Sequence, residues 1–253
     1  MKYIPIVFLL FSLFVVQLSH ASYLVTTINT TVSLNTNTSA QVVEILRVSV
    51  NNNSVSQYST DRLALNLTLS QWQTLMGPSL VQHIVNPRGS IYNFDFLPGP
   101  LINSANGKIA YLVMSYSVTN VTTINQTGPR TFLYQFNPAN FNYQNAVSGQ
   151  VLGQNTTLHI ILPTGARIDR ISPPPDVPVA GFEQNYRNVT SLTWSSDESL
   201  SAFTLTYTVQ ESLQDEVLSF FDSLYARLGT FAFVIIILAI ALFIIYTYLK
   251  ARK

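Results

Sequence analysis

Histidines and acidic residues are the side chains of this sequence that could act as bases or as metal ligands. Beyond the N-terminal apolar stretch there are two histidines, His83 and His159, and both fall in segments whose alternating pattern predicts strands. A histidine at such a position is more often a strand residue than a base. The acids are scattered, and Asp197 with Glu198 offers fewer oxygen ligands than a calcium loop needs. The sequence therefore predicts no catalytic residue and no metal site.

Motifs that would indicate a particular chemistry are also missing from the sequence. There is no cysteine, and we find no G-x-S-x-G elbow, no H-E-x-x-H pair and no glycine-rich phosphate loop. Without cysteine the chain has no thiolate nucleophile and no lipoprotein anchor. An exported chain without disulfides favours a prokaryotic envelope as its setting. We expect a protein that is not an enzyme and that carries no cofactor.

Charge is sparse along the sequence. Only 10% of the residues are charged, and the stretch 22–210 holds eight acidic and eight basic residues. Such a balance gives no basic patch for nucleic acid and no field that would steer a charged substrate. The surface is expected to be polar through Ser, Thr, Asn and Gln instead. Nucleic acid is therefore excluded as a partner.

An aromatic-rich stretch, FLYQFNPANFNYQN, is the strongest candidate for a partner surface. If exposed, its rings could stack on sugars or on the side chains of another protein. Alternation on a strand is also typical of a buried core, and the sequence leaves both interpretations open. The residues concerned are Phe132, Tyr134, Phe136, Phe141 and Tyr143.

Glycosylation acceptors of the form Asn-x-Ser/Thr occur throughout the middle of the chain. Alternation in YLVTTINTTVSL and RLALNLTLS places Asn29 and Asn66 on the polar face of their predicted strands. Two more lie in a loop that we expect to be a hairpin tip, Asn120 and Asn125. The full set of candidates is Asn29, Asn37, Asn52, Asn66, Asn120, Asn125, Asn155 and Asn188.

A period of two residues dominates the sequence and predicts a mainly β fold. We expect a β-sandwich over residues 22–145, in which RLALNLTLS is a strand with Leu63, Leu65, Leu67 and Leu69 on one face, and Leu24 shares the buried face of the first strand. KIAYLVMSYSV should be central and buried on both faces. One short helix is predicted at SQWQTLM, with Ser70 as its N-cap. Residues 146–210 should form a second β-domain or an extension of the sheet.

The pattern becomes helical near the C-terminus. Apolar residues recur every three or four positions over residues 211–228, which predicts an amphipathic stalk helix. Its apolar stripe, with Val217, Phe220 and Leu224, could pair with a second copy or a partner helix, or could lie against the β-domain or a membrane surface. The stalk could also continue into the following segment as one helix of about 55 Å.

Both ends of the sequence indicate export and membrane anchoring. Residues 229–249 contain no charge, and about 31 Å of helix matches the hydrocarbon core, so we predict a transmembrane helix there. The basic residues Lys250, Arg252 and Lys253 follow and place the tail, 250–253, in the cytoplasm. Residues 1–21 have the pattern of a secretory signal peptide. The expected topology is a single-pass plasma-membrane protein with its ectodomain outside.

This layout resembles two known groups of proteins. With its Asn/Tyr/Ser/Thr-rich ectodomain, C-terminal span and short basic tail, the chain resembles membrane-anchored envelope proteins of acidophilic archaea. In strand order and anchor position it is similar to the luminal region of ribophorin I, a non-catalytic subunit of oligosaccharyltransferase. The resemblances rest on no specific motif and imply no site residue.

Two classes of function follow from the sequence. The first is a non-catalytic, glycosylated cell-surface protein with structural, adhesion or interaction roles, whose partner is a surface protein or a glycan; a viral envelope glycoprotein belongs to the same class. The second is an accessory subunit of a membrane enzyme or secretion complex, with its span packed against other helices. The predicted span, 229–249, has few of the small residues that such packing favours, which leads us to expect the first class.

Overall fold

The structure is a computed structural model of the 253-residue chain. It describes residues 23–64, 67–77, 79–105, 107–146, 149–176 and 189–229, together with 231, 234, 238–243 and 250. Several predicted features therefore lie outside the described residues: the signal peptide, most of the predicted span, Leu65, Asn66, Asn188, Arg252 and Lys253.

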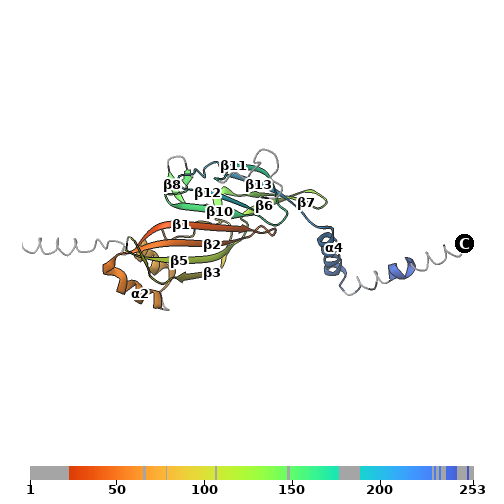
Figure 1. Ribbon diagram of the computed structural model, residues 1–253. Helices are drawn as coiled ribbons and strands as arrows, with labels where there is room; N and C mark the ends of the chain where they lie inside the picture. The colour runs from red at the N-terminus through yellow and green to blue at the C-terminus, as the bar shows by residue number, and fades with distance from the viewer. Residues whose placement is uncertain are drawn as a thin grey trace, which may run out of the picture.

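Two β-sheets stack face to face and make up most of the molecule (Figure 1). The first has seven strands, of which β4 pairs with β5 beside the main path. In sheet order its strands are β12 (Ser191–Ser195), β10 (Thr156–Ile161), β1 (Tyr23–Leu34), β2 (Ala40–Val50), β5 (Gly107–Val118) and β3 (Ile91–Pro98), with β4 spanning Ile102–Ser104. The fold is mainly β, as the two-residue period predicts.

A second sheet covers one face of the first. It has four strands in the order β11 (Arg167–Ser172), β13 (Thr204–Gln210), β7 (Thr131–Phe136) and β6 (Thr122–Gly128). A separate short hairpin pairs β8 (Gln144–Ala146) with β9 (Gly149–Val151), and a 3₁₀ turn, η2 (Pro138–Asn140), follows β7. Nine of these strands coincide with segments in which the sequence predicts a strand, whereas β4, β6, β8 and β9 were not expected. The nine segments are YLVTTINTTVSL, QVVEILRVSV, SIYNFDF, KIAYLVMSYSV, RTFLYQF, TTLHIILP, ARIDRIS, SLTWSS and SAFTLTYTV.

The two halves of the sequence share both sheets. In the larger sheet β10 pairs in parallel with β1, so that Val32 lies beside Ile160. In the smaller sheet β13 pairs with β7, and Tyr207 lies beside Tyr134. The described strands of residues 146–210 therefore extend the sheets begun by residues 23–145, apart from β9, which pairs with β8 in the short hairpin.

The main hydrophobic core lies between the two sheets. Alternate residues of β1, β2, β5, β10 and β12 point inward from the larger sheet and meet the inward side chains of β7, β11 and β13 of the smaller one. Its centre is aromatic: the Phe203 ring contacts the rings of Phe136, Phe141 and Trp194 edge-on or nearly so, at centroid distances of 4.9–5.7 Å. Phe136, Phe141 and Trp194 are at most 2% exposed.

Two helices cover the other part of the same face and close a second core. Helices α2 (Val55–Leu63) and α3 (Leu69–Met76), preceded by a short 3₁₀ turn η1 (Asn52–Ser54), place Tyr58 and Trp72 against Tyr23 of β1. The strand predicted at RLALNLTLS is thus wrong, because α2 ends at Leu63 and α3 begins at Leu69. The N-cap of α3 is Thr68, and not Ser70: Thr68 and Gln71 form a capping box.

Local irregularities change which residues face the core. A register shift between Val25 and Thr27 turns the start of β1 over, so that Tyr23 is buried and Leu24 is 65% exposed, contrary to the expected alternation. Strand β5 is central, as predicted, but only one of its faces is buried; Tyr111 on the other face is 41% exposed. The four-stranded sheet covers one face of the larger sheet only.

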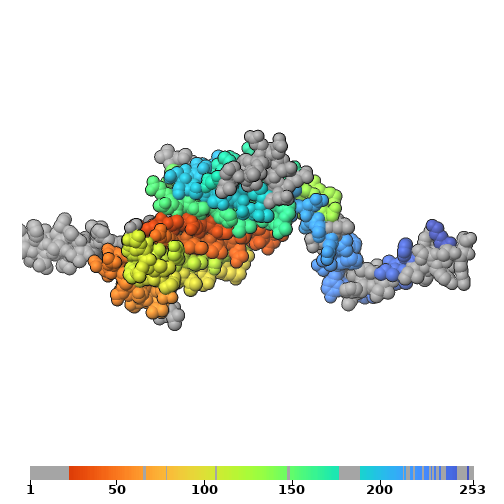
Figure 2. All heavy atoms as spheres, in the orientation of Figure 1, coloured from red at the N-terminus to blue at the C-terminus, as the bar shows by residue number. Residues whose placement is uncertain are grey.

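The amphipathic segment near the C-terminus is helical, as predicted, and forms α4 (Leu213–Leu228). It stands at the end of the sandwich opposite α2 and apart from the sheets (Figures 1 and 2). Gly229 then adopts φ +55°, and its N–H donates to the Tyr225 carbonyl at 2.7 Å. A left-handed glycine is a helix C-cap, so α4 ends at this residue, and the alternative of one long continuous helix is wrong. Among the described residues, no helix is both long and apolar enough to cross a membrane.

Candidate functional site

A buried glutamate lies in the middle of the larger sheet. Glu44 sits on the inward face of β2 between Val42 and Leu46, and all three are fully buried. Its carboxyl group accepts three hydrogen bonds. The His83 backbone N–H donates to Oε1 at 2.8 Å, His83 Nδ1 lies 2.6 Å from Oε2, and the Tyr116 hydroxyl donates to Oε1. These donors compensate the cost of removing a carboxyl group from water.

Tyr116 links the carboxyl group to the backbone of the neighbouring segment. Its oxygen accepts from the Ile84 N–H at 3.2 Å, which leaves its own proton for Glu44. Burial, with the nearby Glu44 charge and the hydrogen bond to it, raises the pKa of Tyr116 well above its usual range. Tyr116 is therefore a fixed donor.

His83 belongs to the irregular segment between α3 and β3, and not to a strand as the sequence suggested. Its carbonyl accepts from the Asn142 N–H at 2.8 Å, and its ring stacks on Tyr143 with centroids 4.9 Å apart. The same segment joins η2, because the Val85 N–H donates to the Asn140 carbonyl at 2.8 Å. The His83 segment thus joins residues 140–143 to Glu44 of β2.

His159 has different surroundings. It lies in β10, as predicted, on the half-buried face of the larger sheet, and its Nδ1 is 2.8 Å from the Thr193 hydroxyl of β12. Because it is on the opposite face of the sheet from His83, the two histidines do not share a site.

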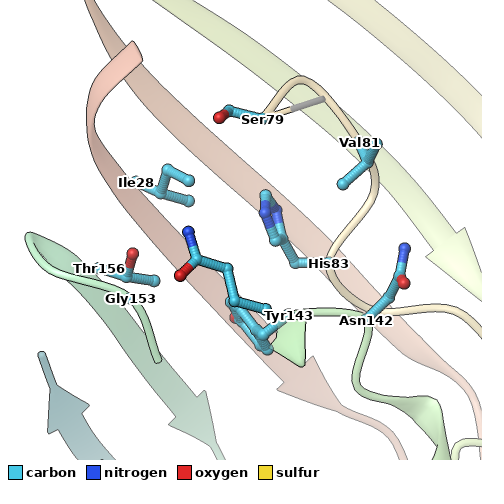
Figure 3. Close-up of a pocket in the computed structure, with 9 residues that line it drawn as sticks. Ile28, Ser79, Val81, His83, Asn142, Tyr143, Gly153 and Thr156 are labelled. Atoms are coloured by element: carbon cyan, nitrogen blue, oxygen red, sulfur yellow. The ribbon is translucent and has the colours of Figure 1, made fainter. Parts of the chain in front are cut away.

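A cavity of about 300 Å³ opens beside His83 (Figure 3). Ile28 reaches it from β1 and Thr156 from the first residue of β10, while the segments 79–83 and 142–144 and Gly153, between β9 and β10, supply the rest. The residues that line it are Ile28, Ser79, Val81, His83, Asn142, Tyr143, Gln144, Gly153 and Thr156. None of these side chains is acidic, and none is a lysine or arginine.

Two buried hydroxyl groups, one of them on the cavity-lining residue Tyr143, lack a full hydrogen bond. The Tyr143 and Thr30 hydroxyls are both without a well-formed partner, although they lie close enough for Thr30 to lower the pKa of Tyr143 slightly. Burial and the Glu44 charge outweigh this effect and raise the pKa of Tyr143 well above its usual range. Polar groups left unpaired in a core are uncommon and often indicate a ligand or a water site.

The cluster pairs His83 with an acid and, among the described residues, with no nucleophile. With Nδ1 directed to Glu44, the remaining ring nitrogen of His83, Nε2, is the one available to the cavity. Within the described residues no serine or threonine hydroxyl bonds to His83, so no nucleophile is paired with it. Nor do those residues include a cluster of three or more His, Cys, Asp or Glu side chains that could hold a metal ion.

The aromatic stretch predicted as a partner surface is mostly core. Tyr134, Phe136, Phe141 and Tyr143 are at most 7% exposed, and Phe132 is partly buried against the same core. Of the two interpretations that the sequence leaves open, the buried core is the one that these residues fit, because β7 lies inside the smaller sheet and turns its alternate side chains toward the larger one. Tyr143 differs from the other four aromatic residues because it lines the cavity as well as the core.

Six of the eight glycosylation candidates lie among the described residues, and all six are exposed: Asn29, Asn37, Asn52, Asn120, Asn125 and Asn155. Asn29 faces outward from β1, as predicted. The hairpin tip was misplaced, because Asn120 lies in the turn between β5 and β6, while Asn125 lies within β6 opposite Leu133.

Helix α4 has an exposed apolar surface. Val217, Leu218, Phe220, Phe221 and Tyr225 are each 44–59% exposed. The side chain of Leu224 is not among those that the structure describes. Lys250 is exposed, and nothing is described of Arg252 and Lys253.

The buried cluster was missed by sequence reasoning, although one signal for it is present. An acidic residue interrupts the apolar face of QVVEILRVSV, and such an acid must find donors when the strand is buried. The donors themselves come from residues 39 and 72 positions away, and no local pattern identifies them.

Comparisons with known proteins identify no relative. No known family matches the sequence, and no curated protein does. Among solved structures, the NMR structure of the folded domain of LppM from Mycobacterium tuberculosis is 7% identical, with 77% of this chain and 93% of that chain covered and a TM-score of 0.29. A likeness at this level supports no conclusion about function.

Proposed function

We propose that this chain is an exported, single-pass membrane protein whose β-sandwich is a non-catalytic, glycosylated module with structural or interaction roles outside the cell. The observation that carries the proposal is the exposure of every described glycosylation candidate. Asn29 and Asn125 are in strands, where half of the positions face a core, and both are on the solvent side. The membrane-anchored envelope proteins of archaea remain the group that the layout resembles.

The Glu44–His83 cluster supports a non-catalytic role. The carboxyl group is saturated by three donors and fully buried, and His83 holds a loop in place through its backbone as well as its ring. A general base needs a nucleophile or a water-activating partner within hydrogen-bond reach, and the described residues place none there.

The C-terminal arrangement supports anchoring at that end. Helix α4 leaves the sandwich after β13, and the Glu211 N–H donates to the Arg130 carbonyl at 2.9 Å where the chain departs. The uncharged residues 230–249 follow the Gly229 cap directly. A span there, with basic residues beyond it, would leave the sandwich outside.

Single-cysteine variants test the topology, because the native chain has no cysteine. Asn52→Cys, in an exposed turn, should react with a membrane-impermeant maleimide on intact cells. Lys253→Cys should react only after the membrane is permeabilised. Labelling of Lys253→Cys on intact cells, or protection of Asn52→Cys, contradicts the proposed orientation.

Mass spectrometry of the protein from its native host tests the glycosylation. We expect glycans at Asn29, Asn120 and Asn125, and none at Asn140, which is fully buried and outside any acceptor motif. Bare acceptors in a mature, exported protein count against this part of the proposal while leaving the topology test unaffected.

A further inference from the structure

The cavity beside His83 has the chemistry of a site for a neutral ligand. Its walls carry hydrogen-bonding groups without net charge: the carboxamides of Asn142 and Gln144, the hydroxyls of Ser79 and Thr156, and the ring of His83. The side chains of Ile28 and Val81, the Tyr143 ring and Gly153 make up the remainder. Walls of this mixed kind suit a small molecule with both hydroxyl groups and apolar ring faces.

Charged ligands find no partner there. No lining residue is acidic, and Glu44, which bonds the lining residue His83, has its two oxygens occupied by three donors, so a cation in the cavity would meet no free carboxylate from its walls or from Glu44. No lysine or arginine is among the lining residues, so a phosphate or carboxylate would lack a counter-charge. The volume of about 300 Å³ lies at the small end of the range for ligand sites, about 300–1,000 Å³.

The polar groups are held in place before any ligand arrives. Nδ1 of His83 is directed to Glu44, which orients the imidazole and leaves Nε2 for the cavity. The ring also stacks on Tyr143, whose own backbone N–H donates to the Gln150 side chain at 3.0 Å. At Gly153 an added Cβ would stand 3.2 Å from the Gln144 carboxamide, so the absence of a side chain there leaves room for that amide. Preorganised groups lower the entropic cost of binding.

A glycosylation candidate stands at the rim of the cavity. Asn155 is exposed, has φ +56°, and its carbonyl accepts from the N–H of the lining residue Ile28 at 3.1 Å. Its immediate neighbour, Thr156, also lines the cavity. A glycan attached to Asn155 would therefore begin one residue away from these walls.

We propose that this cavity binds a saccharide, through neutral hydrogen bonds from its hydroxyl groups to His83 Nε2 and to the surrounding amides and hydroxyls. Two sources share that chemistry: a free or partner-borne sugar, and the first sugar of a glycan on Asn155. The second source rests on the glycosylation in the proposed function, and the first does not.

The imidazole NMR signals of the full-length protein in mild detergent report on the site. The sequence has three histidines, so the spectrum is simple, and His159 on the opposite face of the sheet is an internal control. In protein from a non-glycosylating host, methyl N-acetylglucosaminide should shift the His83 signals saturably and leave those of His159 in place. Inorganic phosphate and choline, as charged probes, should leave both in place.

Variants of the lining residues define the site. Ser79→Phe should fill the cavity and weaken binding at least tenfold. Gln144→Leu keeps a similar volume but removes the amide, and should weaken binding several-fold; its side chain is exposed enough that folding should survive. An unchanged His159 signal shows that each variant is folded.

The Thr157→Val variant distinguishes a free or partner-borne sugar from the glycan on Asn155. It removes the Asn155 acceptor motif without changing a lining residue. If the glycan of Asn155 fills the cavity, native glycosylated protein should show a His83 signal displaced from that of Thr157→Val and should no longer respond to free sugar. A bare Asn155 together with saturable binding of free sugar supports the proposal and removes only the intramolecular source.

The proposal is overturned if His83 responds neither to the free sugar nor to occupancy of Asn155. It is also overturned if phosphate or choline shifts His83 as strongly as the sugar, or if Ser79→Phe and Gln144→Leu bind the sugar as well as the native protein does.

Discussion

Replacing Glu44 by glutamine tests whether the buried polar cluster stabilises the sandwich. Glutamine preserves the shape of the side chain but has a single acceptor oxygen, and it brings two N–H donors into a space where three donors already point. At least one donor loses its partner, which costs about 1–3 kcal/mol for a buried group and more where the lost acceptor was charged. We expect Glu44→Gln to lower the free energy of unfolding by about 3 kcal/mol.

Urea unfolding of the full chain in mild detergent measures this loss. The two tryptophans report on both parts of the fold, because Trp194 belongs to the core between the sheets and Trp72 to the core under α2 and α3. With an m-value of about 2 kcal/mol/M, a loss of about 3 kcal/mol lowers the urea midpoint by about 1.5 M. Glu211→Gln, at an exposed position, is the matched control and should change stability by less than about 0.5 kcal/mol.

A double-mutant cycle with Tyr116→Phe separates the cluster from general effects of substitution. Since Tyr116 donates to Glu44, the two changes should couple by about 0.5–3 kcal/mol. If Glu44→Gln unfolds within about 0.5 kcal/mol of the native protein, or if the two changes are simply additive, the hydrogen bonds to Glu44 do not stabilise the fold.

The remaining predictions concern the two cores. Burial raises the pKa of Tyr58 from 10.0 to about 12, so the stabilisation that comes from keeping its proton is complete below pH 10 and is lost as the pH rises through about 12. Tyr58→Phe should flatten this decline in an alkaline unfolding series, and ionisation of Tyr58 near pH 10 in the folded protein, seen by ultraviolet titration, would refute it. Phe136→Ala should cost about 3–5 kcal/mol in urea unfolding, whereas Ile124→Ala, at a 46% exposed position, should cost less than about 0.5 kcal/mol. Equal and small losses would mean that the Phe136 ring is not core.

Alternation with a period of two residues predicted most strands correctly, because successive side chains of a strand point to opposite faces and only one face is buried. β2 and β5 each place every second residue in a core, and the sequence shows it directly. The same signal failed at RLALNLTLS, where leucines alternate but part of the segment is the end of α2, with Leu63 70% exposed. Helix α2 has little apolar periodicity of its own, because it contributes mainly Tyr58 and the buried Asp61 to the core. Its position depends on contacts with Tyr23, 38 residues from Asp61, which no local pattern contains.

Local patterns could not predict the order of the strands either, because strand pairing also depends on residues that are far apart in the sequence. The parallel pairing of β1 with β10 joins Ile28 to Thr156, and each strand alone would satisfy its alternation equally well beside another neighbour. The aromatic stretch shows the consequence. Phe132, Tyr134 and Phe136 alternate whether β7 is an exposed edge or an inner strand, and only the pairing of β7 with both β6 and β13 makes their inward face core.

Glu44 shows how a local anomaly can still indicate a site. An acidic side chain on an apolar strand face is too costly to bury unless donors converge on it, so its presence in QVVEILRVSV predicts a polar cluster before any partner is known. Satisfying the carboxyl group requires the His83 segment to lie across the sheet, and that segment in turn forms one wall of the cavity. The cavity and the buried carboxyl group are therefore consequences of one arrangement. A change that frees the His83 segment should open the site and destabilise the core together, which distinguishes a built site from an accidental gap between loops.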